Sequence, residues 1–128
     1  MNAQSQIELQ NRIVVTTARA ISGDWDAAAV NIEIDEIEGE QTENCLALSF
    51  ARQQDTWKRN SFQLPYECYD LFVKLRDLSD REKWKTCTLE FDHNGKYKFS
   101  FSYDAPRRLN GIHDDEAMLK GYTPVSLS

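Results

Sequence analysis

The apolar residues of the first segment recur at helical spacing. In residues 3–21 they form one stripe along a helix, made of Ile7, Val14, Ala18 and Ile21. Ser22-Gly23-Asp24 follows the stripe, and Gly23 suits the left-handed cap that ends many helices. The pattern therefore predicts a helix over residues 3–21.

Residues 27–38 alternate between apolar and polar side chains, as a half-buried strand does. One face carries Val30, Ile32 and Ile34, and the other carries Asn31, Glu33 and Asp35. The alternation breaks at Glu36-Ile37, which predicts a bulge or a fraying strand end before Gly39 opens a polar loop.

Two further strands and a second helix follow. Leu46, Leu48 and Phe50 share one face of a strand predicted over residues 44–53. A shorter strand is predicted over 57–64, because proline at position 65 cannot continue a strand ladder. Helical spacing then returns over residues 66–79, with an apolar stripe of Tyr69, Phe72, Leu75 and Leu78.

The stretch CTLEFDHNGKYKFSFSYD, residues 87–104, is a hairpin with an aromatic ribbon. Asn94-Gly95 predicts a type I′ turn, since both residues tolerate positive φ. The first arm alternates through Cys87, Leu89 and Phe91, and the return arm through Tyr97, Phe99, Phe101 and Tyr103. A ribbon with apolar residues on one side only must bury that side, so the hairpin is expected to form core under the two helices.

The predicted elements follow the order α-β-β-β-α-β-β. This order is typical of an α+β fold, with a mostly antiparallel sheet of about five strands and the helices packed on one face. A chain of 128 residues is expected to form a single domain over residues 1–128. Its core is expected over about 5–105, with 106–128 as an irregular C-terminal extension.

Composition narrows the class of protein further. With 41% apolar and 28% charged residues, the chain is expected to be a folded soluble protein. No apolar run approaches the roughly 18 residues of a membrane span, and MNAQSQIELQ lacks the features of a secretory signal. Three cysteines without ligand spacing, Cys45, Cys68 and Cys87, are expected to be reduced, as in a cytoplasmic protein.

The residues that carry chemistry are sparse. No nucleophile motif, glycine-rich phosphate loop or metal-ligand spacing occurs, so we expect no catalytic residue, metal or cofactor. The net charge of −6 argues against direct nucleic-acid binding, which needs a basic surface. A small hydrolase or metal-dependent enzyme that uses His113 with Asp114 and Asp115 remains an alternative.

The strongest charge feature is the segment EIDEIEGEQTE, residues 33–43, which contains six acidic residues and no lysine or arginine. One interpretation is a solvated strand end and loop. The other is an acidic surface that attracts a basic partner, because concentrated like charge accelerates association with an oppositely charged surface.

The hairpin and the elements before it resemble the YezG-like immunity proteins. The shared pattern is Trp84, then a strand, then Asn94-Gly95-Lys96, then an aromatic alternation that ends in Tyr103-Asp104. The resemblance covers about residues 5–105. Arg107-Arg108 partly fits the segment that follows in the family, whereas the family's tryptophan-containing stretch is absent here.

The resemblance implies an immunity protein that binds the toxic C-terminal domain of a polymorphic toxin delivered between neighbouring bacteria, as in contact-dependent inhibition. Such toxins are often nucleases, including EndoU-like RNases, and binding in the recipient's cytoplasm blocks their activity. A nuclease active site is basic because it holds phosphates, so an acidic surface can occupy it. The expected toxin-binding residues are Glu33, Asp35, Glu36, Glu38 and Glu40, with Trp57 or Tyr122 as an apolar anchor.

A different class of binder fits the same residues. A regulatory or adaptor module with a non-toxin partner would show the same acidic surface and the same lack of catalytic groups. The acidic run and the outer face of the ribbon would also suit a homodimer.

Overall fold

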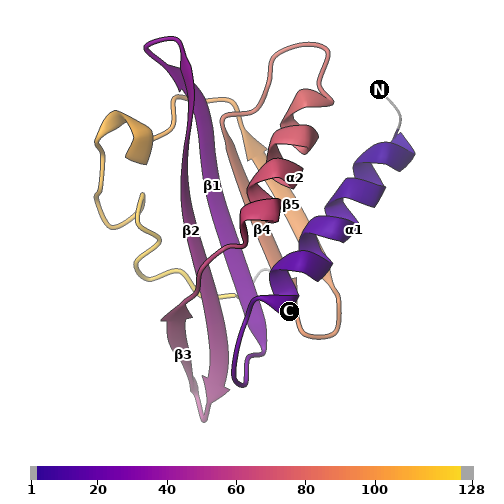
Figure 1. Ribbon diagram of the computed structural model, residues 1–128. Coiled ribbons are helices and arrows are strands. Elements are labelled where there is room, and N and C mark those ends of the chain that lie inside the picture. Colours follow the sequence, from indigo (N-terminus) through magenta and orange to yellow (C-terminus); the bar gives the residue numbers. More distant parts are fainter. Residues whose placement is uncertain (1–2, 125–128) are drawn as a thin grey trace.

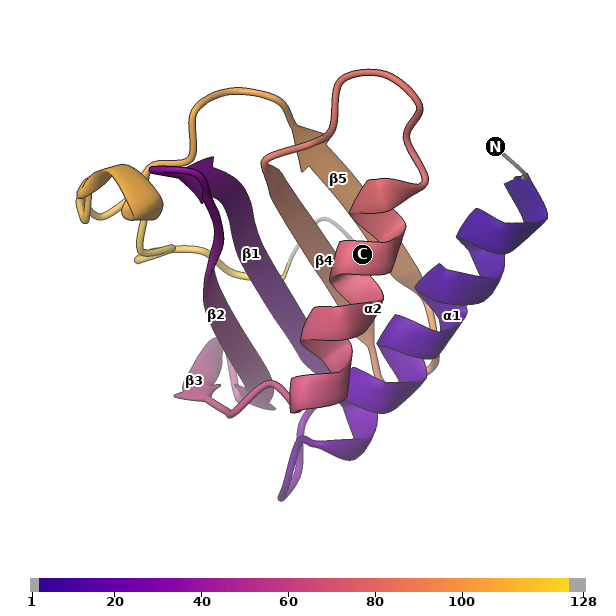
Figure 2. The ribbon, with the colours of Figure 1, turned by 45° about the horizontal axis from the view of Figure 1, so that its top comes forward.

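The computed structural model describes residues 3–124 and has two helices on one face of a five-stranded sheet (Figures 1 and 2). The elements are α1 (Ala3–Arg19), β1 (Ala27–Ile37), β2 (Glu40–Gln53), β3 (Thr56–Ser61), α2 (Tyr66–Asp77), β4 (Thr86–Asp92), β5 (Tyr97–Ser102) and the short 3₁₀ helix η1 (Arg108–Asn110). The α+β class and the element order predicted from the sequence are confirmed. No helix among the described residues is long and apolar enough to cross a membrane.

The sheet is antiparallel throughout, in the order β3-β2-β1-β4-β5. β1 lies at the centre, and its first eight residues, 27–34, are all buried. Ala28, Val30, Ile32 and Ile34 join the core under the helices, whereas Ala29 joins a second apolar cluster on the opposite face, with Leu48 and Phe50. Both faces of β1 are therefore covered, although its sequence alternates like a strand with one wet face.

The aromatic ribbon packs as core under the helices. Cys87, Leu89 and Phe91 are fully buried, and their cross-strand partners Phe101, Phe99 and Tyr97 pack against the same cluster. Tyr103 follows the end of β5 and is 48% exposed. The alternation thus predicts the buried face of this hairpin for all but its last aromatic residue.

The β1–β2 connection differs from the prediction. β1 and β2 stay paired to Ile37↔Glu40, without the expected bulge, so β2 begins at Glu40 and not at 44. The turn has only two residues, Glu38 (φ 54°) and Gly39 (φ 83°), and positive φ at both is typical of a type I′ hairpin turn. Polar residues continue this ladder because its hydrogen bonds use the backbone and need no apolar side chains.

The β4–β5 turn also differs from the predicted type I′ geometry. Gly95 has a φ of 89°, whereas the φ of Asn94 is not positive. The Gly95 N–H donates to the Asp92 carbonyl, and Asp92 Oδ1 accepts the N–H groups of Asn94 (2.9 Å) and Lys96 (3.0 Å). The Asp92 side chain thus stabilises a turn in which only the glycine is left-handed.

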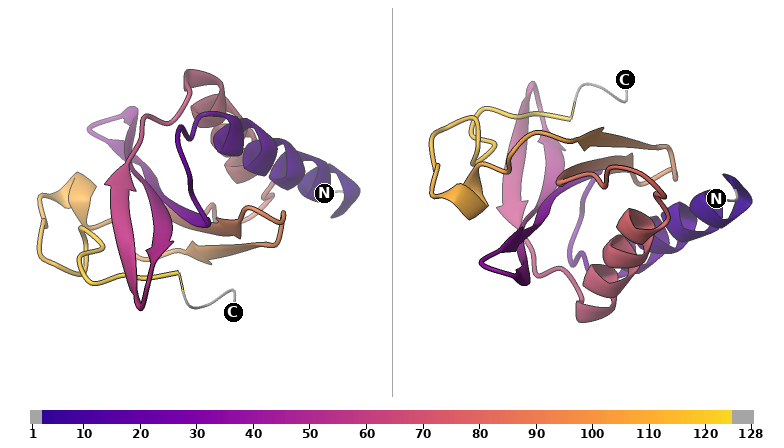
Figure 3. Two further views of the ribbon diagram at one scale, coloured as in Figure 1. Left: turned by 90° about the horizontal axis from the view of Figure 1, so that it is seen from below. Right: turned by 90° about the horizontal axis from the view of Figure 1, so that it is seen from above.

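The chain after β5 lies on the sheet face away from the helices (Figure 3). Within its described residues, up to 124, η1 is the one regular element, and this part of the chain packs closely against the sheet. Leu119 and Tyr122 cover a small cluster of Ala29, Leu48 and Phe50. The Arg59 guanidinium of β3 donates to the carbonyls of Met118 and Leu119. We call residues 103–124 the C-terminal segment.

Candidate functional site

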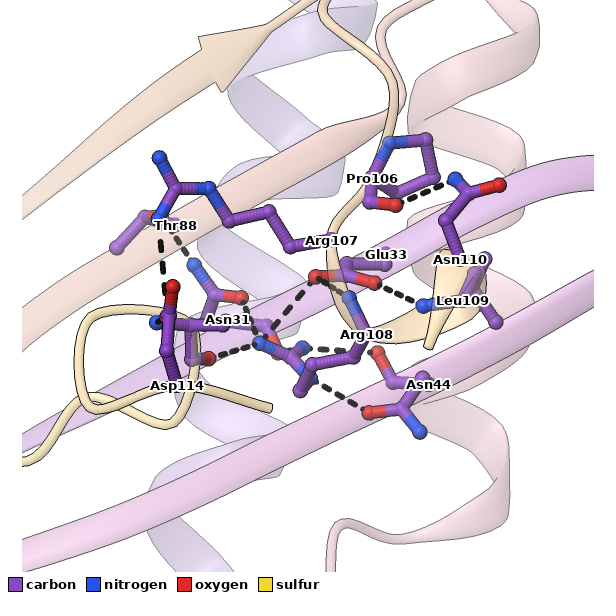
Figure 4. Close-up of polar contacts among 11 residues, drawn as sticks. Asn31, Glu33, Asn44, Thr88, Pro106, Arg107, Arg108, Leu109, Asn110 and Asp114 are labelled. Carbon is purple, nitrogen blue, oxygen red and sulfur yellow. Dashed lines mark hydrogen bonds and ion pairs between the residues drawn. The ribbon is translucent and has the colours of Figure 1, made fainter. Parts of the chain in front are cut away.

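Glu33, the first of the predicted toxin-binding residues, is an internal residue. Its side chain is 3% exposed, and its carboxylate accepts the backbone N–H groups of Arg108 (3.2 Å) and Leu109 (2.9 Å) at the start of η1 (Figure 4). Arg108 Nη1 also lies 3.4 Å from Glu33 Oε2. The carboxylate is fully engaged within the fold, so Glu33 is not part of an exposed acidic surface.

The Arg108 guanidinium completes this buried network, drawn in Figure 4. Nε donates to Asn44 Oδ1 (2.6 Å), Nη1 to Asn31 Oδ1 (2.8 Å) and to the Ala117 carbonyl (2.9 Å), and Nη2 to the Asn31 and Asn44 carbonyls. Asn31 is in turn fixed by its hydrogen bond to Thr88 Oγ1 (2.9 Å). Burial lowers the pKa of Arg108, and the Glu33 carboxylate opposes that shift. The network fastens the C-terminal segment to β1 and β2.

The other acidic residues of the run form an exposed group at the β1–β2 turn. Asp35 is half-buried and pairs with Lys85 Nζ at 3.7 Å, which partly neutralises it. The remaining carboxylates are exposed. We call these residues the acidic tip: Glu36, Glu38, Glu40 and Glu43.

The strand register shows on which face of the sheet the residues of the acidic tip lie. Directly opposed residues share a sheet face, so Glu36 lies with its partner Gln41. Glu43 is opposite Ile34, whose side chain belongs to the core under the helices. Glu36, Gln41 and Glu43 therefore lie on the face that carries α2, while Glu38 occupies the turn itself.

Trp57 and Tyr122 do not join the acidic tip. The Trp57 ring packs edge-on against Phe50 with centroids 6.4 Å apart, and the Tyr122 ring lies 5.6 Å from Phe50. The Tyr122 hydroxyl donates to Glu90 Oε2 at 2.6 Å. Both residues cover the second apolar cluster, near the opposite end of β2 from the acidic tip (Figure 1). From Glu40 to Phe50, at about 3.3 Å per residue, the strand runs roughly 33 Å.

That opposite end carries positive charge. Arg52, Lys58 and Arg59 are all exposed on β2 and β3, and the Arg52 guanidinium lies 4.8 Å from the Trp57 ring centroid. These cations lie at the end of β2 away from the acidic tip, beside the exposed Asp55 of the β2–β3 turn.

The two carboxylates of the enzymatic alternative are engaged in local contacts. Asp114 Oδ1 accepts the Ala117 N–H at 2.9 Å, and Asp115 pairs with Lys120 at 3.8 Å. His113, the histidine of that alternative, is exposed next to them in the chain. Within residues 3–124, no three His, Cys, Asp or Glu side chains gather in a way that could hold a metal ion.

Comparison with protein-family models gives a match to immunity proteins described as YezG-like, over residues 31–118. The matched region covers more than half of the chain, from β1 into the C-terminal segment, and contains both Glu33 and Arg108. Comparison with curated proteins gives no match.

Proposed function

The chain belongs to the YezG-like immunity protein family, and from this premise we propose that it neutralises a cognate bacterial toxin by binding the toxin's C-terminal domain in the cytoplasm of the recipient cell. The proposed toxin is a basic nuclease, for example an EndoU-like RNase delivered by contact-dependent inhibition. The observation that carries the choice of a basic partner is the acidic tip, where four exposed carboxylates lie in and beside the β1–β2 turn.

The acidic tip is suited to enter a phosphate-binding site. A nuclease active site concentrates lysine, arginine or metal charge to hold its substrate, and carboxylates on a narrow hairpin present negative charge in a similar way. Glu36, Glu38 and Glu40 are the proposed contacts, with Asp35 at the margin because Lys85 partly neutralises it. Trp57 and Tyr122 are left out of this contact because they cover the second apolar cluster near the other end of β2.

Long-range electrostatic attraction between the acidic tip and a basic toxin changes the association rate constant more than the dissociation rate constant. Opposite charges steer the encounter, and salt screens them over a Debye length of about 8 Å at physiological ionic strength. The association rate constant is therefore expected to fall steeply with salt, while the dissociation rate constant changes less.

Co-expression with the partner tests the proposal first. The protein is tagged and produced with the C-terminal domain of the large secreted protein encoded immediately upstream. A tight complex in which nuclease activity is suppressed is the expected result. Failure to form a complex would contradict the immunity function and favour an adaptor with another partner.

Charge reversal at the acidic tip then tests the surface. Glu36→Lys with Glu38→Lys is expected to lower the association rate constant at least tenfold and to remove most of its salt dependence. Asp55→Lys, in the exposed β2–β3 turn, is the matched control and is expected to leave the rate unchanged. Equal affinity of the reversed and control variants would show that the toxin binds elsewhere.

A further inference from the structure

A pocket of about 390 Å³ opens beside the acidic tip, between the start of β2 and α2. β2 contributes Gln41 and Glu43 to its lining, and α2 contributes Tyr66, Tyr69, Asp70 and Val73. Gln41 is the cross-strand partner of Glu36, so the pocket and the acidic tip form one continuous surface. None of the lining residues carries a positive charge.

Two tyrosines form the aromatic side of this pocket. Tyr66 is the first residue of α2 and is 86% exposed, which is unusual for so large a ring in a folded chain. Tyr69 follows three positions later, on the same side of the helix, with ring centroids 6.3 Å apart and planes inclined by 51°. An exposed tyrosine next to a second ring is a common anchor at protein interfaces.

The Tyr69 hydroxyl stays protonated at neutral pH. Burial, together with the nearby Cys45 thiol and Glu43 carboxylate, raises the pKa of Tyr69 to about 12. The ring therefore adds no negative charge of its own, and the charge of the pocket comes from its carboxylates.

Glu43 and Asp70 supply that charge from β2 and α2 respectively. Both side chains are exposed, and among residues 3–124 neither carboxylate takes part in a hydrogen bond or an ion pair. By contrast, Asp35 pairs with Lys85 and Asp77 pairs with Lys83. The pocket thus joins aromatic surface to uncompensated negative charge.

We propose that this pocket receives an arginine side chain of the partner, with the guanidinium between Glu43 and Asp70 and against the ring of Tyr66. A guanidinium is planar, stacks on aromatic rings and donates to carboxylates in pairs, whereas a lysine ammonium is a compact, strongly hydrated charge. The inference rests on the proposed function, because the arginine is taken to belong to the toxin.

The pocket can be tested in the complex. Tyr66→Ala and Asp70→Asn are each expected to raise the dissociation constant of the toxin domain about 10-fold to 100-fold, mainly through faster dissociation. Tyr103→Ala and Asp55→Asn alter an exposed tyrosine and an exposed aspartate elsewhere and serve as matched controls. If the pocket variants bind the toxin as the controls do, the pocket is not the arginine site, while the proposed function stands.

A second test needs no toxin. Titration of the ¹⁵N-labelled protein with Nα-acetyl-arginine amide is expected to shift the backbone amides around Glu43, Tyr69 and Asp70. Nα-acetyl-citrulline amide, which has nearly the same shape without the charge, is expected to leave them unchanged, and Tyr66→Ala should weaken the arginine response. Equal shifts with both compounds, or none with either, would overturn the inference. Shifts with arginine in a protein that binds no toxin would support the pocket and contradict the proposed function.

The oligomeric state tests whether an arginine of a second copy of this chain occupies the pocket instead. Light scattering after gel filtration is expected to show a monomer for the protein and for Tyr66→Ala. A dimer that Tyr66→Ala dissociates would place an arginine of a second copy in the pocket and would overturn the assignment to a toxin.

Discussion

Arg108 and Glu33, separated by 75 residues, form an ion pair with side chains that are only 2% and 3% exposed. Taking two charges out of water costs several kcal/mol each, and the attraction offsets that cost only if further hydrogen bonds complete both groups. Here the carboxylate has two backbone N–H donors, and the guanidinium has five acceptor contacts besides Glu33. The pair therefore determines where the C-terminal segment lies.

Removal of the Arg108 charge should be among the most destabilising single changes in the chain. Arg108→Met leaves the Glu33 carboxylate buried without its cation, which typically costs about 3–5 kcal/mol of unfolding free energy. Arg107→Met removes a neighbouring, exposed arginine that pairs with Glu116 at 3.1 Å, and should cost less than about 1 kcal/mol. Urea unfolding measures both. Similar losses for the two variants would mean that the buried pair contributes nothing specific.

The stability of the fold should decline in alkali. Burial raises the pKa of Cys45 from 9.0 to about 12 and that of Tyr69 from 10.0 to about 12, and burial with the Glu90 hydrogen bond also raises that of Tyr122. The unfolded chain loses these protons first, so their contribution is complete below about pH 9 and is lost as pH rises towards 12. Urea unfolding at several pH values between 7 and 11 should show this decline.

Tyr122→Phe should isolate the contribution of the Tyr122 hydroxyl to this loss of stability in alkali. The variant removes the donor to Glu90 and should cost about 1–2 kcal/mol at pH 7, with a shallower loss above pH 9. Tyr103→Phe, at an exposed position, is the control. A Tyr122→Phe curve parallel to that of the unmodified protein would contradict the role given to this hydroxyl.

Arg59 should hold the last part of the C-terminal segment in place. Its guanidinium donates to the carbonyls of Met118 and Leu119, and Leu119 has a left-handed φ of 57°, which costs a non-glycine residue about 1 kcal/mol. Arg59→Met should accelerate amide hydrogen exchange around Leu119 and Tyr122 while the amides of α1 and α2 keep their protection. Lys58→Met, on the same strand, should change neither. Faster exchange throughout the molecule would instead indicate global destabilisation.

The three cysteines should resist alkylation in the folded protein. All are free thiols; Cys68 and Cys87 are completely buried, and burial raises the pKa of each cysteine. Since the thiolate is the reactive form, iodoacetamide at pH 8 should modify none of them rapidly, and the half-buried Cys45 should react first. In concentrated urea all three should react within minutes. Rapid modification of Cys87 under native conditions would be inconsistent with the core described here.

Alternation predicted which side chains of the central strands are buried, because a strand places successive residues on opposite faces. Val30, Ile32 and Ile34 pack under the helices as their spacing indicates. The same rule failed where both arms of the β1–β2 hairpin are polar. Pairs such as Asp35↔Thr42 and Glu36↔Gln41 continue the ladder through the backbone, so the sequence contains no apolar signal for them.

The Asp92 side chain explains why the predicted type I′ turn between β4 and β5 was wrong. Asn94-Gly95 is a strong signal for positive φ at both positions, but the Asp92 carboxylate accepts two backbone N–H groups of the turn. Those hydrogen bonds favour a geometry in which Asn94 keeps a negative φ. A rule based on Asn94 and Gly95 alone cannot include this effect of Asp92, two positions before them.

The candidate site was predictable only in part, for a similar reason. The acidic run in 33–43 is visible in the sequence, and Glu36, Glu38 and Glu40 are exposed as an acidic surface requires. Glu33 differs because Arg108 lies 75 residues later, and no spacing rule links such distant positions. The pocket beside α2 was also missed, because Glu43 and Asp70 come together only through the packing of α2 beside β2.

The separation of Arg108 from Glu33 by 75 residues has a consequence for synthesis. The ribosome delivers β1 early, and the β1–β2 hairpin can close as soon as Glu40 and the residues after it emerge. Glu33 nevertheless keeps an uncompensated charge, and β1 an unpaired edge, until β4 and then η1 have been made. The nascent chain therefore cannot complete the surroundings of its central strand until η1 has left the ribosome, so the Glu33–Arg108 pair forms after the β1–β2 hairpin.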